Sequence, residues 1–126
     1  MKLTNREMTD MQSALTEIGN KEIDCLLGVD IARNNYELSK MLNPVEKEKQ
    51  KLLDRYAKKD ETGKLITKGN GIILEDAAKY SEEYDRLMEA DAEVELKKFT
   101  MEEVKKMSPT PNQIMKLFPI IIEEEK

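Results

Sequence analysis

A stripe of apolar residues spaced seven apart constrains the fold of this chain more than any other feature. Its members are Ile31, Leu38, Val45 and Leu52, with Leu27, Leu42 and Tyr56 at the intervening core positions. Apolar residues at this spacing line one face of an α-helix, and a stripe of this length is typical of a helix that packs along another helix. The stripe therefore predicts helical structure across residues 21–58.

A proline interrupts this stripe. Pro44 has no backbone N–H, and its ring clashes with the preceding turn, which costs about 3 kcal/mol in a helix interior. Asn43 as the N-cap, Pro44 at the first helical position and Glu46 at the third would instead start a new helix. Because the stripe keeps its register on both sides of the proline, residues 21–58 form either one kinked helix or two abutting helices.

Two blocks of opposite charge indicate what the long helix packs against. Residues 46–59 contain six Lys or Arg and three acids, whereas residues 75–95 contain nine acids and two Lys or Arg. Between the blocks, two short β-prone segments, 64–67 and 72–74, flank a turn rich in glycine, and predict a small β-hairpin. We therefore predict an antiparallel helical hairpin, with a third helix over 76–91 whose acids neutralise much of the basic block.

Capping boxes mark the shorter helices. Thr4 and Glu7 have the spacing at which each side chain accepts a hydrogen bond from an unpaired backbone N–H at a helix start. This pattern predicts a helix over 5–18. Similar patterns that begin at Thr100 and Thr110 predict two short helices near the carboxyl end of the chain.

Taken together, these elements predict one mostly α domain with minor β structure over 1–122. A short strand is predicted at 94–96, Pro119 ends the helix that begins at Thr110, and 123–126 form an acidic frayed tail. A chain of 126 residues has room for one domain with one modest core.

Residue types that many enzymes need are missing. The chain has no histidine, so it lacks Ser–His and Cys–His pairs and the commonest metal ligand, and its one cysteine, Cys25, has no disulfide partner. We therefore expect a non-enzymatic protein without a cofactor.

A net charge of −5 gives no electrostatic reason to bind nucleic acid, and no apolar run approaches the roughly 20 residues that span a membrane.

The candidate partner-binding residues are one tyrosine and a group of acids. Tyr36 lies off the main apolar stripe and is a candidate surface anchor in an interface. Glu82, Asp85 and Glu89 are three and four residues apart on the predicted third helix, so they share a face, with Glu83 beside them. This face is either solvated or paired with the basic helix, and as a metal site it would need ligands from elsewhere.

The order of the motifs resembles an uncharacterised family of small tailed-phage proteins from Gram-positive bacteria. The matching residues are Leu3–Glu7, Leu52–Gly63, Glu83-Tyr84 with Leu87, Glu93–Leu96, and Ser108-Pro109 followed by Ile114 and Leu117. Pro44 and Pro111 depart from the pattern of the family. Because that family is a domain of unknown function, the resemblance implies only a context, which is a phage or prophage protein in the cytoplasm of a bacterial host or on a virion.

A role in binding another protein accounts for these features with the fewest further assumptions. The expected partner is a host or phage protein. The acidic helix favours an inhibitor that blocks the surface of a host antiviral effector such as a nuclease. The alternative is a factor that assembles the phage head or tail. A small-ligand sequestering protein is the competing class, which a buried Arg33 or Arg86 facing a cavity would favour. The heptad stripe would also suit a homodimer.

Overall fold

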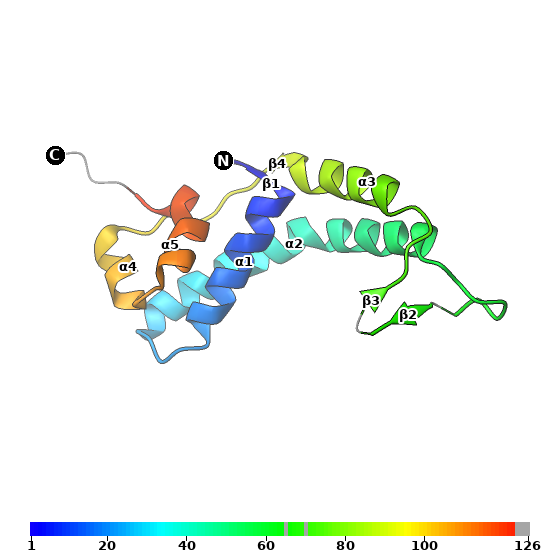
Figure 1. Ribbon diagram of the computed structural model, residues 1–126. Coiled ribbons are helices and arrows are strands. Elements are labelled where there is room, and N and C mark those ends of the chain that lie inside the picture. Colours follow the sequence, from blue (N-terminus) through cyan, green and yellow to red (C-terminus); the bar gives the residue numbers. More distant parts are fainter. Residues whose placement is uncertain (65, 70, 123–126) are drawn as a thin grey trace.

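The computed structural model describes residues 1–64, 66–69 and 71–122, and this part of the chain is mostly helical (Figure 1). Its elements are β1 (Lys2–Thr4), α1 (Asn5–Gly19), α2 (Cys25–Tyr56), β2 (Thr67–Lys68), β3 (Gly71–Ile72), α3 (Ala77–Glu89), β4 (Asp91–Glu93), α4 (Met101–Met107), α5 (Pro111–Leu117) and the 3₁₀ helix η1 (Phe118–Ile120). The predicted fold class, mostly α with minor β, is confirmed. The predicted tail at 123–126 lies outside the described residues.

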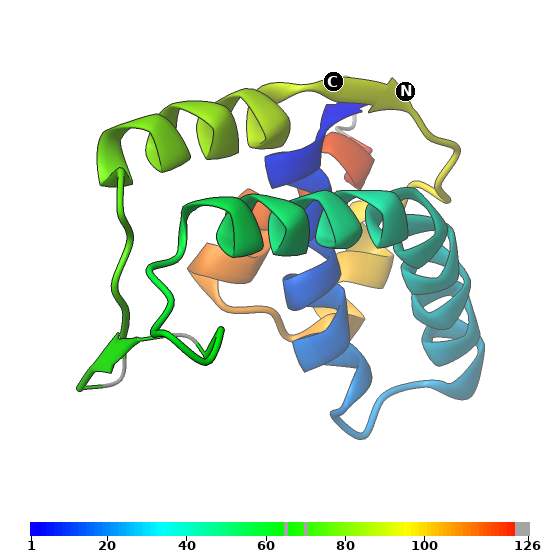
Figure 2. The ribbon, with the colours of Figure 1, turned by 90° about the vertical axis from the view of Figure 1, so that its right-hand side faces the viewer.

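The long helix α2 is continuous through Pro44, so the chain forms one helix here and not two. Figure 2 shows the axis of α2 changing direction in its middle part, as a proline inside a helix commonly causes. The helix begins at Cys25 and not near residue 21, because the Asp24 carboxylate caps it by accepting from the N–H groups of Leu26 and Leu27, at 3.2 Å each.

The core lies where α1 crosses α2 and where α4 and α5 cover them. Its helical members are Met8, Met11, Ala14, Leu15 and Ile18 of α1, Leu27, Ile31, Leu38, Leu42 and Val45 of α2, Met88 of α3, and Val104, Met107, Leu117 and Ile120 nearer the carboxyl end. Burying each large aliphatic side chain contributes about 1.5–3 kcal/mol to stability. The predicted stripe is therefore the inner face of α2, with Tyr56 half-buried at its end.

All three predicted capping boxes are present. The pairs are Thr4 with Glu7, Thr100 with Glu103, and Thr110 with Gln113. In each pair the threonine side chain accepts a hydrogen bond from the backbone N–H of the later residue, and the acid or amide side chain accepts from the backbone N–H of the threonine. These local interactions explain why α1, α4 and α5 begin where the sequence predicts.

The strand predicted at 94–96 lies three residues earlier in the structure. β4 pairs antiparallel with β1, with Leu3 opposite Ala92. The α-ammonium group of Met1 extends this pairing by donating to the Val94 carbonyl at 3.0 Å, and the Asn5 side chain donates to the Leu87 carbonyl at 2.7 Å. The amino terminus therefore holds the carboxyl end of α3 in place.

The predicted helical hairpin is present, because α3 runs antiparallel beside the carboxyl-terminal half of α2 (Figures 1 and 2). We call residues 46–89 the arm. On α3, Tyr80, Tyr84 and Leu87 face α2 but are only half-buried, whereas Ala77 is exposed. The arm therefore carries much less core than the rest of the protein.

The β-hairpin at the tip of the arm is shorter than predicted. β2 and β3 pair antiparallel, with Thr67 opposite Ile72, and residues 65 and 70 of the predicted hairpin lie outside the described residues. The Lys58 N–H donates to the Ile73 carbonyl at 2.8 Å, and the Lys58 carbonyl accepts from Ile66 N–H at 2.9 Å. The hairpin is thus held by the backbone that follows α2.

Candidate interaction surfaces

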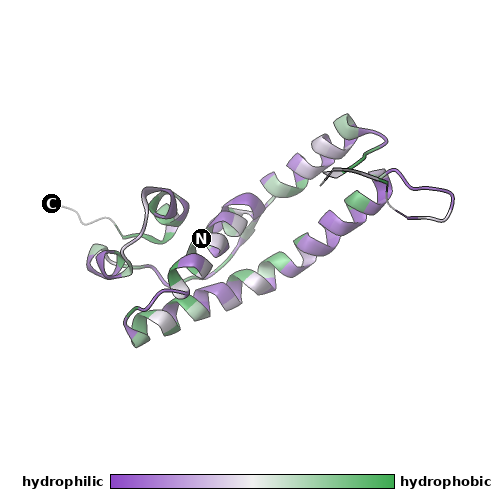
Figure 3. Cartoon of the chain, turned by 60° about the horizontal axis from the view of Figure 1, so that its bottom comes forward, coloured by the Kyte–Doolittle hydropathy of each residue, from purple (hydrophilic) through white to green (hydrophobic). Residues whose placement is uncertain are grey.

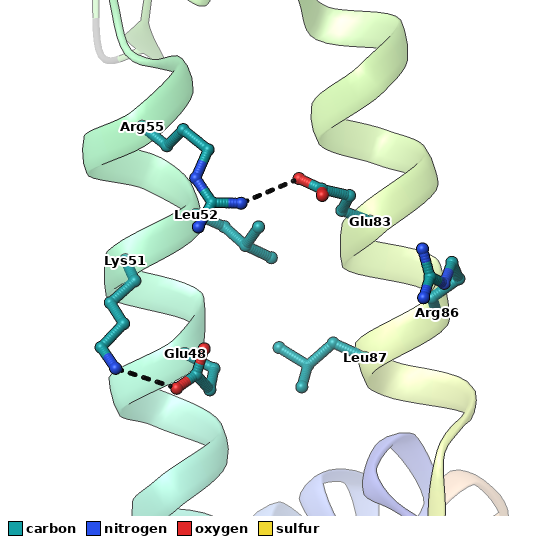
Figure 4. Close-up of a pocket in the computed structure, with 7 residues that line it drawn as sticks. All are labelled: Glu48, Lys51, Leu52, Arg55, Glu83, Arg86 and Leu87. Carbon is teal, nitrogen blue, oxygen red and sulfur yellow. Dashed lines mark hydrogen bonds and ion pairs between the residues drawn. The ribbon is translucent and has the colours of Figure 1, made fainter.

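A cleft of about 330 Å³ lies between α2 and α3 (Figure 4). Leu52 and Leu87 extend toward each other from the two helices and supply its apolar part. Its polar lining comprises Glu48, Lys51, Arg55, Glu83 and Arg86. A cleft of this size and mixed charge is large enough for a small polar ligand or for one side chain of a partner protein.

Four of the five charged residues that line the cleft form ion pairs with each other. Arg55 lies 3.6 Å from the Glu83 carboxylate across the cleft, and Lys51 lies 3.1 Å from Glu48 on its own helix. Arg55–Glu83 is the one ion pair that joins α2 to α3 in the described part of the chain. The prediction that the acidic helix neutralises much of the basic block is therefore wrong. Within the described residues, the two lysines of the block that form ion pairs, Lys49 and Lys51, pair with glutamates three residues earlier on α2.

Tyr56 lies next to this ion pair and is electrostatically linked to it. Hydrogen bonding with the Glu83 carboxylate raises the pKa of the Tyr56 phenol above its ordinary value of 10.0, with smaller contributions from burial and from the negative charge. The phenol is therefore neutral at physiological pH.

The predicted acidic residues divide between two faces of α3. Glu82, Asp85 and Glu89 are exposed on the outer face, whereas Glu83 faces the cleft. Asp85 pairs with Arg6 of α1 at 3.3 Å. In residues 1–64, 66–69 and 71–122, no ion pair involves Glu82 or Glu89. Of the two predicted alternatives, solvation therefore holds for Glu82 and Glu89, whereas Asp85 pairs with α1 and not with the basic helix.

Tyr36 lies on a separate surface, on the amino-terminal half of α2. Its side chain is 64% exposed, and the Lys40 ammonium lies 5.0 Å from the centre of its ring. It lines a groove of about 520 Å³, which we call the α2 groove. The other lining residues are Val29, Ala32, Arg33, Asn34 and Glu37 of α2 and Glu95 and Lys97 of the segment after β4. The structure therefore does not bring Tyr36 together with the acids of α3.

A buried asparagine that was not among the predicted site residues lines the α2 groove. Asn34 is 2% exposed, its Nδ2 donates to the Lys97 carbonyl at 3.0 Å, and its Oδ1 accepts from the Lys97 N–H at 2.9 Å. The two bonds hold the second wall of the groove against α2. The sequence indicated this role in one way: Asn34 is a polar residue between Ile31 and Leu38 on the inner face of the predicted helix.

Ion pairs strengthen the same wall. The Lys97 ammonium pairs with Asp30 of α2 and with Glu103 of α4, and these hydrogen bonds raise the pKa of Lys97 above its ordinary value. Hydrogen bonds from the Thr100 backbone and from Lys97 lower the pKa of Glu103 below its ordinary 4.5. Glu103 therefore stabilises the folded state only while it is ionised.

Acid should weaken the start of α4. Because the pKa of Glu103 is lower in the folded state, the unfolded state binds protons more strongly, so its contribution is full above about pH 4.5 and is lost as pH falls through the lowered pKa. We expect Glu103→Gln, which still caps as Gln113 does in α5, to lose less stability than the wild type between pH 7 and pH 3. Urea unfolding at several pH values measures this, and equal losses in both proteins would contradict it.

Neither Arg33 nor Arg86 is buried, although each lines a hollow, the α2 groove and the cleft respectively. A small-ligand site was expected to have a buried arginine that faces a cavity, and here the arginines face hollows but are exposed.

In the described ranges, no three His, Cys, Asp or Glu side chains gather as metal ligands, and no helix is both long and apolar enough to cross a membrane.

Comparison of the chain with protein-family models, with curated proteins and with solved structures finds no match.

Proposed function

We propose that this protein is a non-enzymatic accessory protein of phage type that binds another protein through the outer face of α3. The observation that carries the proposal is that Glu82 and Glu89 are exposed on this face and form no ion pair within the described part of the chain. Among the described elements, none is held in place by these two charges. They are therefore available to a partner.

The proposed partner has a basic surface. Carboxylates on a regular helix present negative charge at fixed spacing, which complements a groove that binds nucleic acid and speeds association with it. The resemblance to tailed-phage proteins supports a host antiviral effector, such as a nuclease, in the bacterial cytoplasm. In this role the protein inhibits the effector by occupying its functional surface.

The proposal predicts that the acidic face can be removed without unfolding the protein. We expect Glu82→Lys with Glu89→Lys to change the free energy of unfolding by less than about 0.5 kcal/mol, since neither residue forms an ion pair within residues 1–64, 66–69 and 71–122. The same variant should fail to retain the host effector when tagged protein is captured from phage-infected Gram-positive cells. Thermal unfolding and quantitative mass spectrometry of the captured proteins measure the two effects.

A matched variant makes this experiment specific. Glu22→Lys with Glu61→Lys changes the net charge equally at two exposed positions outside α3 and should retain the partner. Loss of capture by both variants would show a general effect of charge and contradict the proposal. Recovery of phage head or tail proteins by the wild type would replace it with a role in virion assembly.

A further inference from the structure

Three large apolar side chains protrude from the amino-terminal half of α2. Leu26 is 73% exposed, Val29 is 45% exposed and Tyr36 is 64% exposed. With Arg33 they follow helical spacing and form one stripe, on the face opposite to Ile31 and the other core residues. Figure 3 shows hydrophobic residues at this end of α2. Exposed apolar side chains in one stripe mark an interaction surface more often than isolated ones do.

The stripe borders a preformed hollow. The α2 groove has a volume of about 520 Å³, and its second wall is the segment that contains Glu95 and Lys97. Asn34 fixes that wall by two hydrogen bonds to the Lys97 backbone. A groove with rigid walls needs little rearrangement on binding, which lowers the entropic cost of association.

The charges of the groove indicate what fills it. Glu37 pairs with Lys40 at 3.1 Å, and Lys97 pairs with Asp30 and Glu103. Two other charged residues line the groove, and neither forms an ion pair within the described residues. They are Arg33, in the middle of the apolar stripe, and Glu95, on the opposite wall.

We propose that the α2 groove binds an amphipathic helix of a partner protein, with a carboxylate at the centre of its apolar face. The apolar residues of that helix contact Val29 and Tyr36, and the carboxylate pairs with Arg33. An occupant that covers Arg33 without supplying an acid would leave its charge desolvated and unpaired, which is strongly unfavourable. Glu95 restricts the acid to the α2 side, because a second acid on the opposite wall would be repelled.

A second copy of this chain is a poorer occupant. Two-fold packing of one stripe against another brings both Arg33 side chains into the middle of the same interface, and like charges there oppose association. The proposed surface is also separate from the acidic face of α3. The inference therefore stands whether or not Glu82 and Glu89 bind a partner.

A library of displayed helical peptides tests this inference. Peptides of about 18 residues, or five turns, with randomised residues on one face are selected on the full-length protein. We expect the selected peptides to share apolar residues around a central Asp or Glu. For a selected peptide, Tyr36→Asp and Arg33→Glu should each weaken binding on the order of tenfold to a hundredfold, as measured by calorimetry.

A charge exchange gives the decisive readout. Changing the acid of the peptide to Lys should restore binding to the Arg33→Glu variant and weaken binding to the wild type. Arg86→Glu, which reverses an exposed arginine on α3, should leave binding unchanged, as should the Glu82→Lys, Glu89→Lys double variant. The latter result separates failure of this inference from failure of the proposed function.

Three outcomes would overturn the proposal. They are a selection that yields no binding peptide, selected peptides without a preference for acid, and binding that survives both Tyr36→Asp and Arg33→Glu. Circular dichroism and thermal unfolding of each variant verify that it is folded. Both substituted side chains are exposed, so we expect the helix content to be unchanged.

Discussion

Replacement of Leu38 with alanine is expected to lower the free energy of unfolding by about 2–5 kcal/mol, the range for a fully buried leucine. Leu38 is 0% exposed and belongs to the core in which α1 packs on α2. Truncation removes buried methyl groups and leaves a cavity that close-packed neighbours fill only in part. Urea unfolding followed by circular dichroism measures the loss.

Leu52 provides a matched control on the same helix. It lies two heptads after Leu38 on the same stripe, but it is 9% exposed, and it packs in the arm outside the main core. We expect Leu52→Ala to lower stability less than Leu38→Ala and to increase amide exchange chiefly within residues 46–89. An equal or greater loss for Leu52→Ala would contradict the separation of a packed body from a lightly packed arm.

Asn34→Ala is expected to have the second largest effect, a loss of about 2–3 kcal/mol. The substitution removes two hydrogen bonds and leaves the N–H and carbonyl of Lys97 without partners in a partly buried position. Because these bonds hold the second wall of the α2 groove, the loss should include local opening there. Urea unfolding measures the stability, and hydrogen exchange at the Lys97 amide measures the opening.

The neighbouring residue is the control for this experiment. Asn35 makes only a long hydrogen bond, 3.5 Å to the Thr16 hydroxyl, and its Oδ1 has no partner within the described residues. Asn35→Ala should therefore change stability by less than about 1 kcal/mol. Similar losses for the two variants would mean that Asn34 matters as a polar helix residue and not as a clamp on Lys97.

Local interactions explain the parts of the fold that were predicted. The Thr4–Glu7 box defines the start of α1, because both partners of each hydrogen bond lie within one helical turn. The same reasoning holds for the boxes that begin at Thr100 and Thr110. The stripe from Leu27 to Leu52 indicated the inner face of α2, since burial of aliphatic side chains depends on their spacing along the helix.

Contacts between distant residues explain the parts that were missed. β1 contains only three residues, too few for an alternating pattern, and it exists as a strand because β4 pairs with it from 89 residues along the chain. The clamp of Asn34 on Lys97 spans 63 residues. Neither pairing has a signal in the local sequence, because the partner is brought near only when the core assembles.

For the candidate surfaces, the amino-acid sequence by itself determined which residues share a helix face. Spacing of three and four residues placed Glu82, Asp85 and Glu89 together, and the position of Tyr36 off the stripe indicated its exposure. Only the tertiary structure decided what each face meets. Packing of the Tyr80, Tyr84 and Leu87 side chains on α2 sets the rotation of α3 about its axis, and this rotation leaves Glu82 and Glu89 in solvent while Glu83 meets Arg55.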